Sequence, residues 1–313
     1  MCAESTGSSS LAARVLRGLR ATPAYMWLIV LAAVAAGCAF GPCRQNTAER
    51  DVMEGAESIR IERGHSRVCL LLHGFGSSPA DFGRLPAALD EAGWDVCVPR
   101  LPGHGTSPDA LRQVSPARLR KAARERYNEL RSRYETVALG GFSMGGCLAT
   151  GIAAERPPHS LVLVNPFFAV TYRWYYVFPV EWYLPVASPL LDAVPAQKSV
   201  NRPEGKKDIV AYETYPLEAV NMLMDLRDTI LADLDDGALQ CPVLLVYSAG
   251  DSVASPAETG EVLDRVTGGD YRTRRFTRSN HHVLHDYDRE EVVRCIVDWL
   301  AEDTSRQHEE GRP

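Results

Sequence analysis

The stretch Gly141-Phe142-Ser143-Met144-Gly145 matches the pattern G-x-S-x-G, and its flanks fit a turn between a strand and a helix. Residues 137–139 precede it as a short buried strand, and the small apolar residues 146–156 follow as a helix. A chain that turns this sharply strains the backbone of its pivot residue, so the two glycines give the turn room. The pattern therefore predicts that Ser143 presents its hydroxyl as a nucleophile at the end of a strand.

Apolar strands alternate with helices on both sides of this turn. We expect strands at residues 68–72, 94–98, 161–164, 242–247 and 271–276, and helices at residues 79–92, 116–134 and 290–300. Because the strands are apolar throughout, this order predicts a protein of the α/β class, with a mostly parallel sheet and helices on both faces. Ligands of such sheets bind at the carboxyl ends of the strands, where Ser143 lies.

Residues 58–301 form the predicted catalytic domain, and residues 167–237 interrupt its alternation. The first part of this interruption is crowded with aromatic residues and prolines, and a helix is expected at residues 218–231. We interpret the interruption as a cap inserted over the sheet, whose aromatic side chains form an apolar acyl pocket. Any one of these aromatic side chains can equally serve only to pack the cap onto the core. The polar tail at residues 302–313 is predicted to be disordered.

Residues 1–38 have the layout of an export signal, in which a basic segment is followed by an apolar run and small residues. The apolar run, residues 25–36, ends close to Cys38, and we expect this cysteine to be lipidated as in bacterial lipoproteins. The alternative is an uncleaved membrane anchor, because the run approaches the roughly 20 residues that span a bilayer. Either arrangement tethers the protein to the outer side of the cytoplasmic membrane, with residues 39–57 as a linker.

The composition is that of an ordinary globular protein, since 45% of its 313 residues are hydrophobic and 24% are charged. A net charge of −6 gives no electrostatic reason to expect a nucleic-acid partner. The eight cysteines include no C-x-x-C pair and no His/Cys cluster, so no metal site is predicted. The composition leaves the oligomeric state open.

Ester or amide cleavage by a serine needs a base and a carboxylate that orients this base. Asp251 follows the strand predicted at residues 242–247, and His281 follows the strand predicted at residues 271–276. The order Ser143, Asp251, His281 fits three loops at the same edge of the sheet. His282 is the alternative base, because only one of two adjacent imidazoles can face Ser143.

Backbone donors must also stabilise the oxyanion that forms during the reaction. The N–H groups of Phe75 and Met144 are the predicted donors, because Phe75 lies in the loop after the first clear strand and Met144 follows the nucleophile. His73 is expected to fix the loop that carries Phe75, and His104 to stabilise a neighbouring loop. His285 is expected on the surface.

Four segments of the chain resemble the α/β-hydrolase superfamily, and more closely its bacterial carboxylesterases and monoacylglycerol lipases. They are Leu71-Leu72-His73-Gly74-Phe75, Leu101-Pro102-Gly103-His104-Gly105, Gly141-Phe142-Ser143-Met144-Gly145-Gly146 and Ser279-Asn280-His281. The resemblance implies an α/β-hydrolase fold with a cap above the sheet, no cofactor and an ester substrate. The doubled histidine at positions 281 and 282 departs from the single histidine of the family.

The sequence therefore predicts a serine esterase that acts on short or medium acyl chains or on monoacylglycerols through an acyl-enzyme intermediate. An acyltransferase or a peptidase with the same triad is the nearest enzymatic alternative. From another class, the chain could be a membrane-tethered binding module whose triad is vestigial. The superfamily hosts many reactions, so the motifs alone leave the substrate open.

Overall fold

The computed structural model describes residues 52–171 and 192–310. In this part of the chain seven strands form one sheet in the order β1-β3-β2-β4-β5-β8-β9. The strands are β1 (Ile59–Ile61), β2 (Arg67–Leu72), β3 (Asp95–Val98), β4 (Thr136–Phe142), β5 (Ser160–Val164), β8 (Val243–Ser248) and β9 (Arg272–Phe276). Neighbouring strands are parallel except β1 and β3, which are antiparallel. The prediction of a mostly parallel sheet is confirmed, and β1 is the only one of these seven strands that was not predicted.

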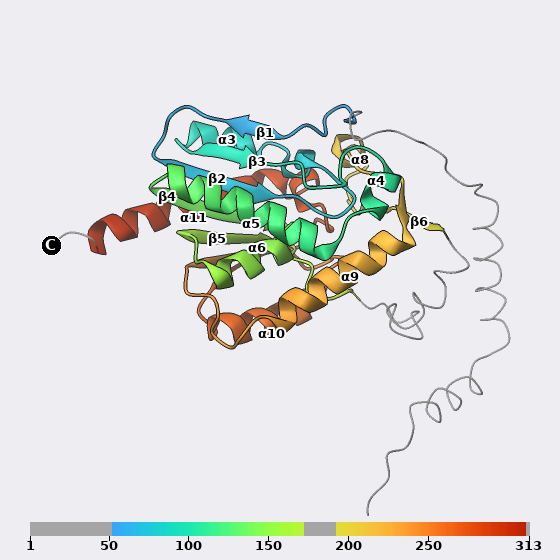
Figure 1. Ribbon diagram of the computed structural model, residues 1–313. Coiled ribbons are helices and arrows are strands. Elements are labelled where there is room, and N and C mark those ends of the chain that lie inside the picture. Colours follow the sequence, from blue (N-terminus) through green and yellow to red (C-terminus); the bar gives the residue numbers. More distant parts are fainter. Residues whose placement is uncertain (1–51, 172–191, 311–313) are drawn as a thin grey trace, which may run out of the picture. The chain divides into compact units, whose positions relative to one another are not determined.

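The side chains of each strand alternate between two cores, one on each face of the sheet. In β2, Leu70 and Leu72 enter one core, whereas Cys69 and Leu71 enter the other. Four helices cover the first core: α5 (Pro116–Arg133), α6 (Met144–Glu155), α9 (Leu217–Ala232) and α10 (Pro256–Thr267). Two cover the second: α3 (Leu85–Glu91) and α11 (Arg289–Glu310). Figure 1 shows α5 and α6 in front of the strands, and helices thus lie on both faces as predicted.

The single helix predicted at residues 79–92 is wrong, because two shorter elements take its place. A 3₁₀ helix, η1 (Pro79–Phe82), ends at Gly83, and α3 begins at Leu85. Gly83 has a φ of 48°, which a helix cannot contain and which glycine adopts without steric cost. Phe82, Leu85 and Leu89 still reach the same core, as the apolar spacing required.

The segment between β5 and β8, where a cap was predicted at residues 167–237, lies only in part within the described residues. In its described part, β6 (Ala193–Pro195) and β7 (Thr214–Pro216) form a two-stranded antiparallel ribbon. The short helix α8 (Gly205–Asp208) lies between these two strands in the sequence, and α9 follows β7. Leu226 and Ile230 of α9 are buried in the same core as α6, so this helix belongs to the helical layer of the domain. The aromatic residues predicted to line an acyl pocket lie largely within residues 172–191, outside the described residues.

The remaining predictions concern the two ends of the chain, namely the N-terminal export signal and linker and the C-terminal tail. The export signal, Cys38 and most of the linker lie within residues 1–51, outside the described residues. Among the residues that the structure describes, no helix combines the length and the apolar character needed to cross a membrane. At the other end, α11 continues to Glu310, where the composition predicted disorder from residue 302. An ion pair between Arg272 and Glu302, 3.0 Å long, ties the helix to β9 at this point.

Candidate active site

Ser143 lies at the pivot between β4 and α6, where the G-x-S-x-G pattern predicted it. Its backbone has a φ of 53° and a ψ of −119°, which is a rare conformation for a residue with a side chain. A Cβ at Gly141 would collide with the carbonyl of Gly145, and a Cβ at Gly145 would collide with the carbonyl of Leu72. The Ser143 N–H donates to the Val164 carbonyl at 3.1 Å. Only glycine therefore fits at positions 141 and 145, two residues before and two residues after the pivot.

The structure brings Ser143, His281 and Asp251 into one hydrogen-bonded chain. His281 Nε2 lies 2.9 Å from Ser143 Oγ, and His281 Nδ1 lies 2.7 Å from Asp251 Oδ2. All three side chains are buried. Because a carboxylate can only accept, Nδ1 carries the proton of the neutral imidazole and Nε2 is left to accept the Ser143 proton. This arrangement can activate a serine hydroxyl for attack on an acyl group.

Asp251 is held so that only one of its oxygens faces the histidine. It follows β8 by three residues, at the carboxyl edge of the sheet. Its Oδ1 accepts hydrogen bonds from the N–H groups of Val253 and Ala254 at 2.8 and 2.9 Å. The backbone therefore fixes the carboxylate, and Oδ2 is directed at His281.

His282, the alternative base, does not contact Ser143 in the structure. Its ring packs edge-on against His281 at a centroid distance of 5.6 Å and lies 5.3 Å from the ring of Phe142. Burial, together with the neighbouring His281, lowers the pKa of His282 well below its usual value. No atom in the described part of the chain accepts from or donates to its Nδ1. His282 is thus a neutral ring packed against His281 and Phe142.

Acidic side chains that the sequence did not single out hold the loop that carries His281. Asp286 is fully buried, and its carboxylate accepts four backbone hydrogen bonds of 2.7–2.8 Å, from Asn201, Arg202, Asn280 and Tyr287. Asp288 accepts from the Ser279 hydroxyl at 2.8 Å and from Arg278. The prediction that His285 lies on the surface is wrong, because its side chain is buried and its Nε2–H donates to the Ala80 carbonyl at 2.9 Å.

Asn165 is a further residue that sequence reasoning missed. It follows β5 and, like Ser143 at the end of the adjacent strand, has a positive φ, here 42°. Its Nδ2 donates to the His281 carbonyl at 2.6 Å, and its Oδ1 accepts from the Ser248 N–H at 2.8 Å. The side chain thereby links the histidine loop, which we define as residues 277–288 between β9 and α11, to the end of β8. A polar residue directly after an apolar strand was the available signal.

The predicted oxyanion donors occupy two adjoining backbone segments. Phe75 lies in the loop after β2, and Met144 is the first residue of α6. In the residues described, the N–H of neither one donates to a protein acceptor. His73 fixes the loop as expected, because its Nδ1–H donates to the Gly74 carbonyl at 2.9 Å and its Nε2 accepts from the Leu101 N–H at 3.0 Å.

His104 supports the same region, as expected. Its Nδ1 lies 2.9 Å from the Pro102 carbonyl, and its ring packs against that of His73 at 5.1 Å. Burial lowers the pKa of His104 to about 4 and that of His73 well below its usual value. Both rings are therefore neutral supports at physiological pH.

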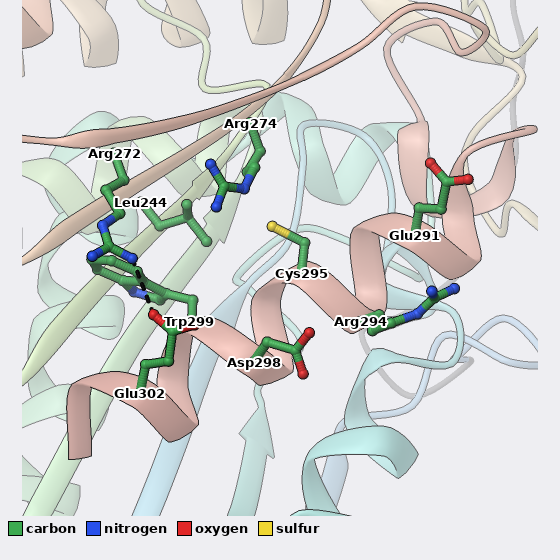
Figure 2. Close-up of a pocket in the computed structure, with 9 residues that line it drawn as sticks. All are labelled: Leu244, Arg272, Arg274, Glu291, Arg294, Cys295, Asp298, Trp299 and Glu302. Atoms are coloured by element: carbon green, nitrogen blue, oxygen red, sulfur yellow. Dashed lines mark hydrogen bonds and ion pairs between the residues drawn. The ribbon is translucent and has the colours of Figure 1, made fainter. Parts of the chain in front are cut away.

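A cavity of about 250 Å³ lies elsewhere, between β9 and α11 (Figure 2). Three arginines and three carboxylates line it: Arg272, Arg274, Arg294, Glu291, Asp298 and Glu302. No predicted site residue borders this cavity, and its opposite charges balance one another. Within the described residues, no group of three or more His, Cys, Asp or Glu side chains is arranged to hold a metal ion.

Comparisons with known proteins agree with this geometry. Residues 64–288 match the model of the family described as "Serine aminopeptidase, S33". The chain is 27% identical over 256 residues to a thermostable monoacylglycerol lipase from a Bacillus species, covering 80% of this chain and 96% of that protein. It is 22% identical over 254 residues to a carboxylesterase of Bacillus subtilis, covering 76% and 94%.

Solved structures with the same architecture include a protein from work on LipS and LipT, two metagenome-derived lipolytic enzymes. It superposes with a TM-score of 0.72 at 23% identity, covering 80% of this chain and all of that one. The monoacylglycerol lipase of Paleococcus ferrophilus superposes with a TM-score of 0.65 at 20% identity, covering 79% and 98%. At these identities the likeness concerns the fold, and the predicted α/β-hydrolase fold is confirmed.

Proposed function

Since the chain belongs to the serine aminopeptidase family and is an esterase- or lipase-like serine hydrolase, we propose that it cleaves carboxylic esters through an acyl-enzyme intermediate at Ser143. The substrates we propose are esters of short to medium acyl chains or monoacylglycerols. The observation that carries the proposal is the hydrogen-bonded chain from Ser143 Oγ through His281 to Asp251. The monoacylglycerol lipase and the carboxylesterase among its relatives support the substrate class.

In the proposed acylation step, Ser143 Oγ attacks the carbonyl carbon of the ester while His281 Nε2 takes the hydroxyl proton. The ester carbonyl oxygen becomes an oxyanion, which the N–H groups of Phe75 and Met144 stabilise. Asp251 keeps the proton of His281 on Nδ1 and stabilises the imidazolium that forms. The intermediate collapses when His281 donates its Nε2 proton to the leaving alcohol, and the acyl group remains on Ser143.

Deacylation repeats the chemistry with water as the nucleophile. His281 takes one proton from the water as its oxygen attacks the acyl carbon, and the same N–H groups stabilise the second oxyanion. The proton then returns to Ser143 Oγ as the carbon–oxygen bond to the serine breaks. The fatty acid leaves, and the enzyme is restored without a cofactor taking part in the step.

The test measures hydrolysis of p-nitrophenyl esters of graded chain length and of monoacylglycerols. We expect Ser143→Ala to lower kcat by about 10⁴-fold or more, as for other serine hydrolases. Ser132→Ala, on the exposed face of α5, serves as the matched control and should keep full activity. Equal rates for wild type and Ser143→Ala would remove the proposal, and the chain-length profile decides between short esters and monoacylglycerols.

A peptidase activity is the second candidate, because the matching family is described as serine aminopeptidases. The same triad can cleave an amide, provided that His281 protonates the departing amine. Aminoacyl p-nitroanilides distinguish the two activities. We expect kcat/KM for esters to exceed that for anilides by more than about tenfold, and the opposite ratio would make the peptidase the better assignment.

We also propose that the N-terminal segment tethers the enzyme outside the cytoplasmic membrane through a lipid on Cys38. The basic residues, the apolar run at residues 25–36 and the small residues before Cys38 support this proposal. The measurement is membrane fractionation and intact mass of wild type and Cys38→Ala. Loss of the lipid mass and of membrane retention is expected, whereas unchanged mass and retention would favour the uncleaved anchor.

A further inference from the structure

A carboxylate outside the triad holds the loop that carries Phe75. Asp81 lies in η1, and its side chain is buried. Its Oδ2 accepts a hydrogen bond from the Gly74 N–H at 2.9 Å, and its Oδ1 accepts one from the Ser77 hydroxyl at 2.5 Å. Both donors belong to the loop between β2 and η1, so this carboxylate closes the loop on itself.

The backbone of Gly74 is thereby held on both sides of its Cα. Asp81 holds the N–H, and the Nδ1–H of His73 donates to the carbonyl at 2.9 Å. The peptide bond between Gly74 and Phe75 is planar and trans, so its N–H points away from its C=O. A fixed carbonyl at Gly74 therefore fixes the direction of the Phe75 N–H.

Packing leaves this loop little room to move. A Cβ at position 74 would lie 3.1 Å from Asp81 Oδ2 and 3.1 Å from the ring of Phe142, the residue before the nucleophile. Ala80, also in η1, accepts a hydrogen bond from the Nε2–H of His285 through its carbonyl. This bond joins η1 to the histidine loop. Asp81 thus lies where three segments meet: the loop that carries Phe75, the turn at Ser143 between β4 and α6, and the histidine loop.

We propose that Asp81 is a positioning residue that aims the Phe75 N–H at the oxyanion formed during ester hydrolysis. The inference rests on the proposed function, because this oxyanion exists only if Ser143 attacks an acyl group. Burial raises the pKa of Asp81 to about 6 even with two donors in place, so an ionised carboxylate at this position costs stability. A buried carboxylate with this cost, bonded to the loop that carries Phe75, fits a role in the geometry of the site.

The test measures how fast a fluorophosphonate labels Ser143, because the phosphoryl oxygen draws on the same N–H donors as an ester. We expect Asp81→Ala to lower both the labelling rate and kcat by about 30- to 100-fold, with KM changed less than about threefold. Asp81→Asn keeps an acceptor for the Gly74 N–H and should stay within about fivefold of wild type. Both quantities are expressed per folded molecule, because partial unfolding would also lower the apparent kcat and leave KM unchanged.

Asp95→Ala is the matched control. Asp95 is also a buried carboxylate and accepts hydrogen bonds from the Arg63 N–H at 2.8 Å and the Tyr134 hydroxyl at 2.9 Å, but it begins β3, at the edge of the sheet opposite to Ser143. This variant should lose stability and keep the wild-type labelling rate per folded molecule. Equal losses of labelling in Asp81→Ala and Asp95→Ala would overturn the positioning role.

The outcomes separate this inference from the proposed function. A wild-type protein that is not labelled overturns the proposed function, whereas equal labelling of wild type and Asp81→Ala overturns only the role of Asp81. If Asp81→Ala does not fold, Ser77→Ala takes its place, because it removes the donor to Oδ1. A labelling rate about three- to tenfold lower is expected for Ser77→Ala, and an unchanged rate overturns the inference.

Discussion

The two turns that meet in the candidate triad are held by different forces. In the nucleophile turn between β4 and α6, glycines make room for close backbone contacts, and the Phe167 N–H donates to the Ser143 carbonyl at 3.0 Å. In the histidine loop, side-chain acceptors such as Asp286 hold the backbone. A single added methyl group can prevent the close backbone contacts of the nucleophile turn altogether. The histidine loop, in contrast, can lose one hydrogen bond and keep the others. We therefore expect the two turns to fail differently when a single side chain changes.

The largest effect is expected for Gly145→Ala in the nucleophile turn. The added methyl group would collide with the carbonyls of Leu72 and His73, and backbone atoms cannot move aside as a flexible side chain can. We expect the free energy of unfolding to fall by about 3–5 kcal/mol or the chain not to fold, with activity lost in proportion. Urea unfolding and titration of reactive Ser143 with a fluorophosphonate measure both quantities.

Gly260→Ala in α10 is the matched control, because a Cβ at that position meets no atom within 4 Å. Alanine is favoured over glycine inside a helix, so this variant should gain about 0.5–1 kcal/mol and keep full activity. If Gly145→Ala is as stable and active as Gly260→Ala, the nucleophile turn is not sterically locked and the comparison between the two turns fails.

The same contrast explains what could be predicted from the sequence. The nucleophile turn is encoded within five consecutive residues, so Ser143 and its strand-to-helix context could be identified directly. The alternation of apolar segments likewise predicted the parallel sheet, and the motifs predicted the relation to carboxylesterases and monoacylglycerol lipases, which the relatives confirm. The catalytic roles of Ser143, Asp251 and His281 stay predictions, although the structure places these residues in hydrogen-bond contact.

The histidine loop could not be predicted because its contacts join distant parts of the chain. Asp286 binds the N–H groups of Asn201 and Arg202, 85 and 84 residues away, and Asn165 reaches His281 across 116 residues. No local pattern records such pairs, so the sequence left His281 and His282 as alternatives. The buried position of His285 was missed for the same reason, because its partner, the Ala80 carbonyl, is 205 residues away.

Asp286→Asn should produce an intermediate effect, in the histidine loop. Asparagine keeps one acceptor oxygen but turns an NH₂ group toward two backbone donors, which leaves these donors without a partner. We expect a loss of about 2–4 kcal/mol in the free energy of unfolding and a fall in kcat of about 10- to 100-fold, because His281 is displaced. Thermal unfolding and steady-state kinetics on a p-nitrophenyl ester provide the measurements.

Asp264→Asn is the control for this substitution, since its carboxylate lies on the surface and accepts from the Tyr271 hydroxyl at 2.9 Å. We expect a change below about 0.5 kcal/mol and no loss of kcat for this variant. A fall in stability for Asp286→Asn without any fall in kcat would contradict the idea that the four hydrogen bonds position His281.

The smallest expected effect concerns how the free energy of unfolding depends on pH, which differs between the two turns. Residues 141–145 contain no titratable side chain, whereas the histidine loop contains His282, whose pKa burial and His281 lower well below 6.5. As pH falls below 6.5, the unfolded chain binds a proton that the folded loop rejects, so the folded state loses stability; above 6.5 this loss is absent.

The substitution His282→Val removes this titratable group, while His73, His104 and His285 contribute equally in both proteins. Between pH 6.5 and 5.5 we expect the free energy of unfolding to fall by about 1 kcal/mol less in the variant than in wild type, measured by urea unfolding. Parallel stability curves over that range would show that His282 takes up a proton without unfolding the loop.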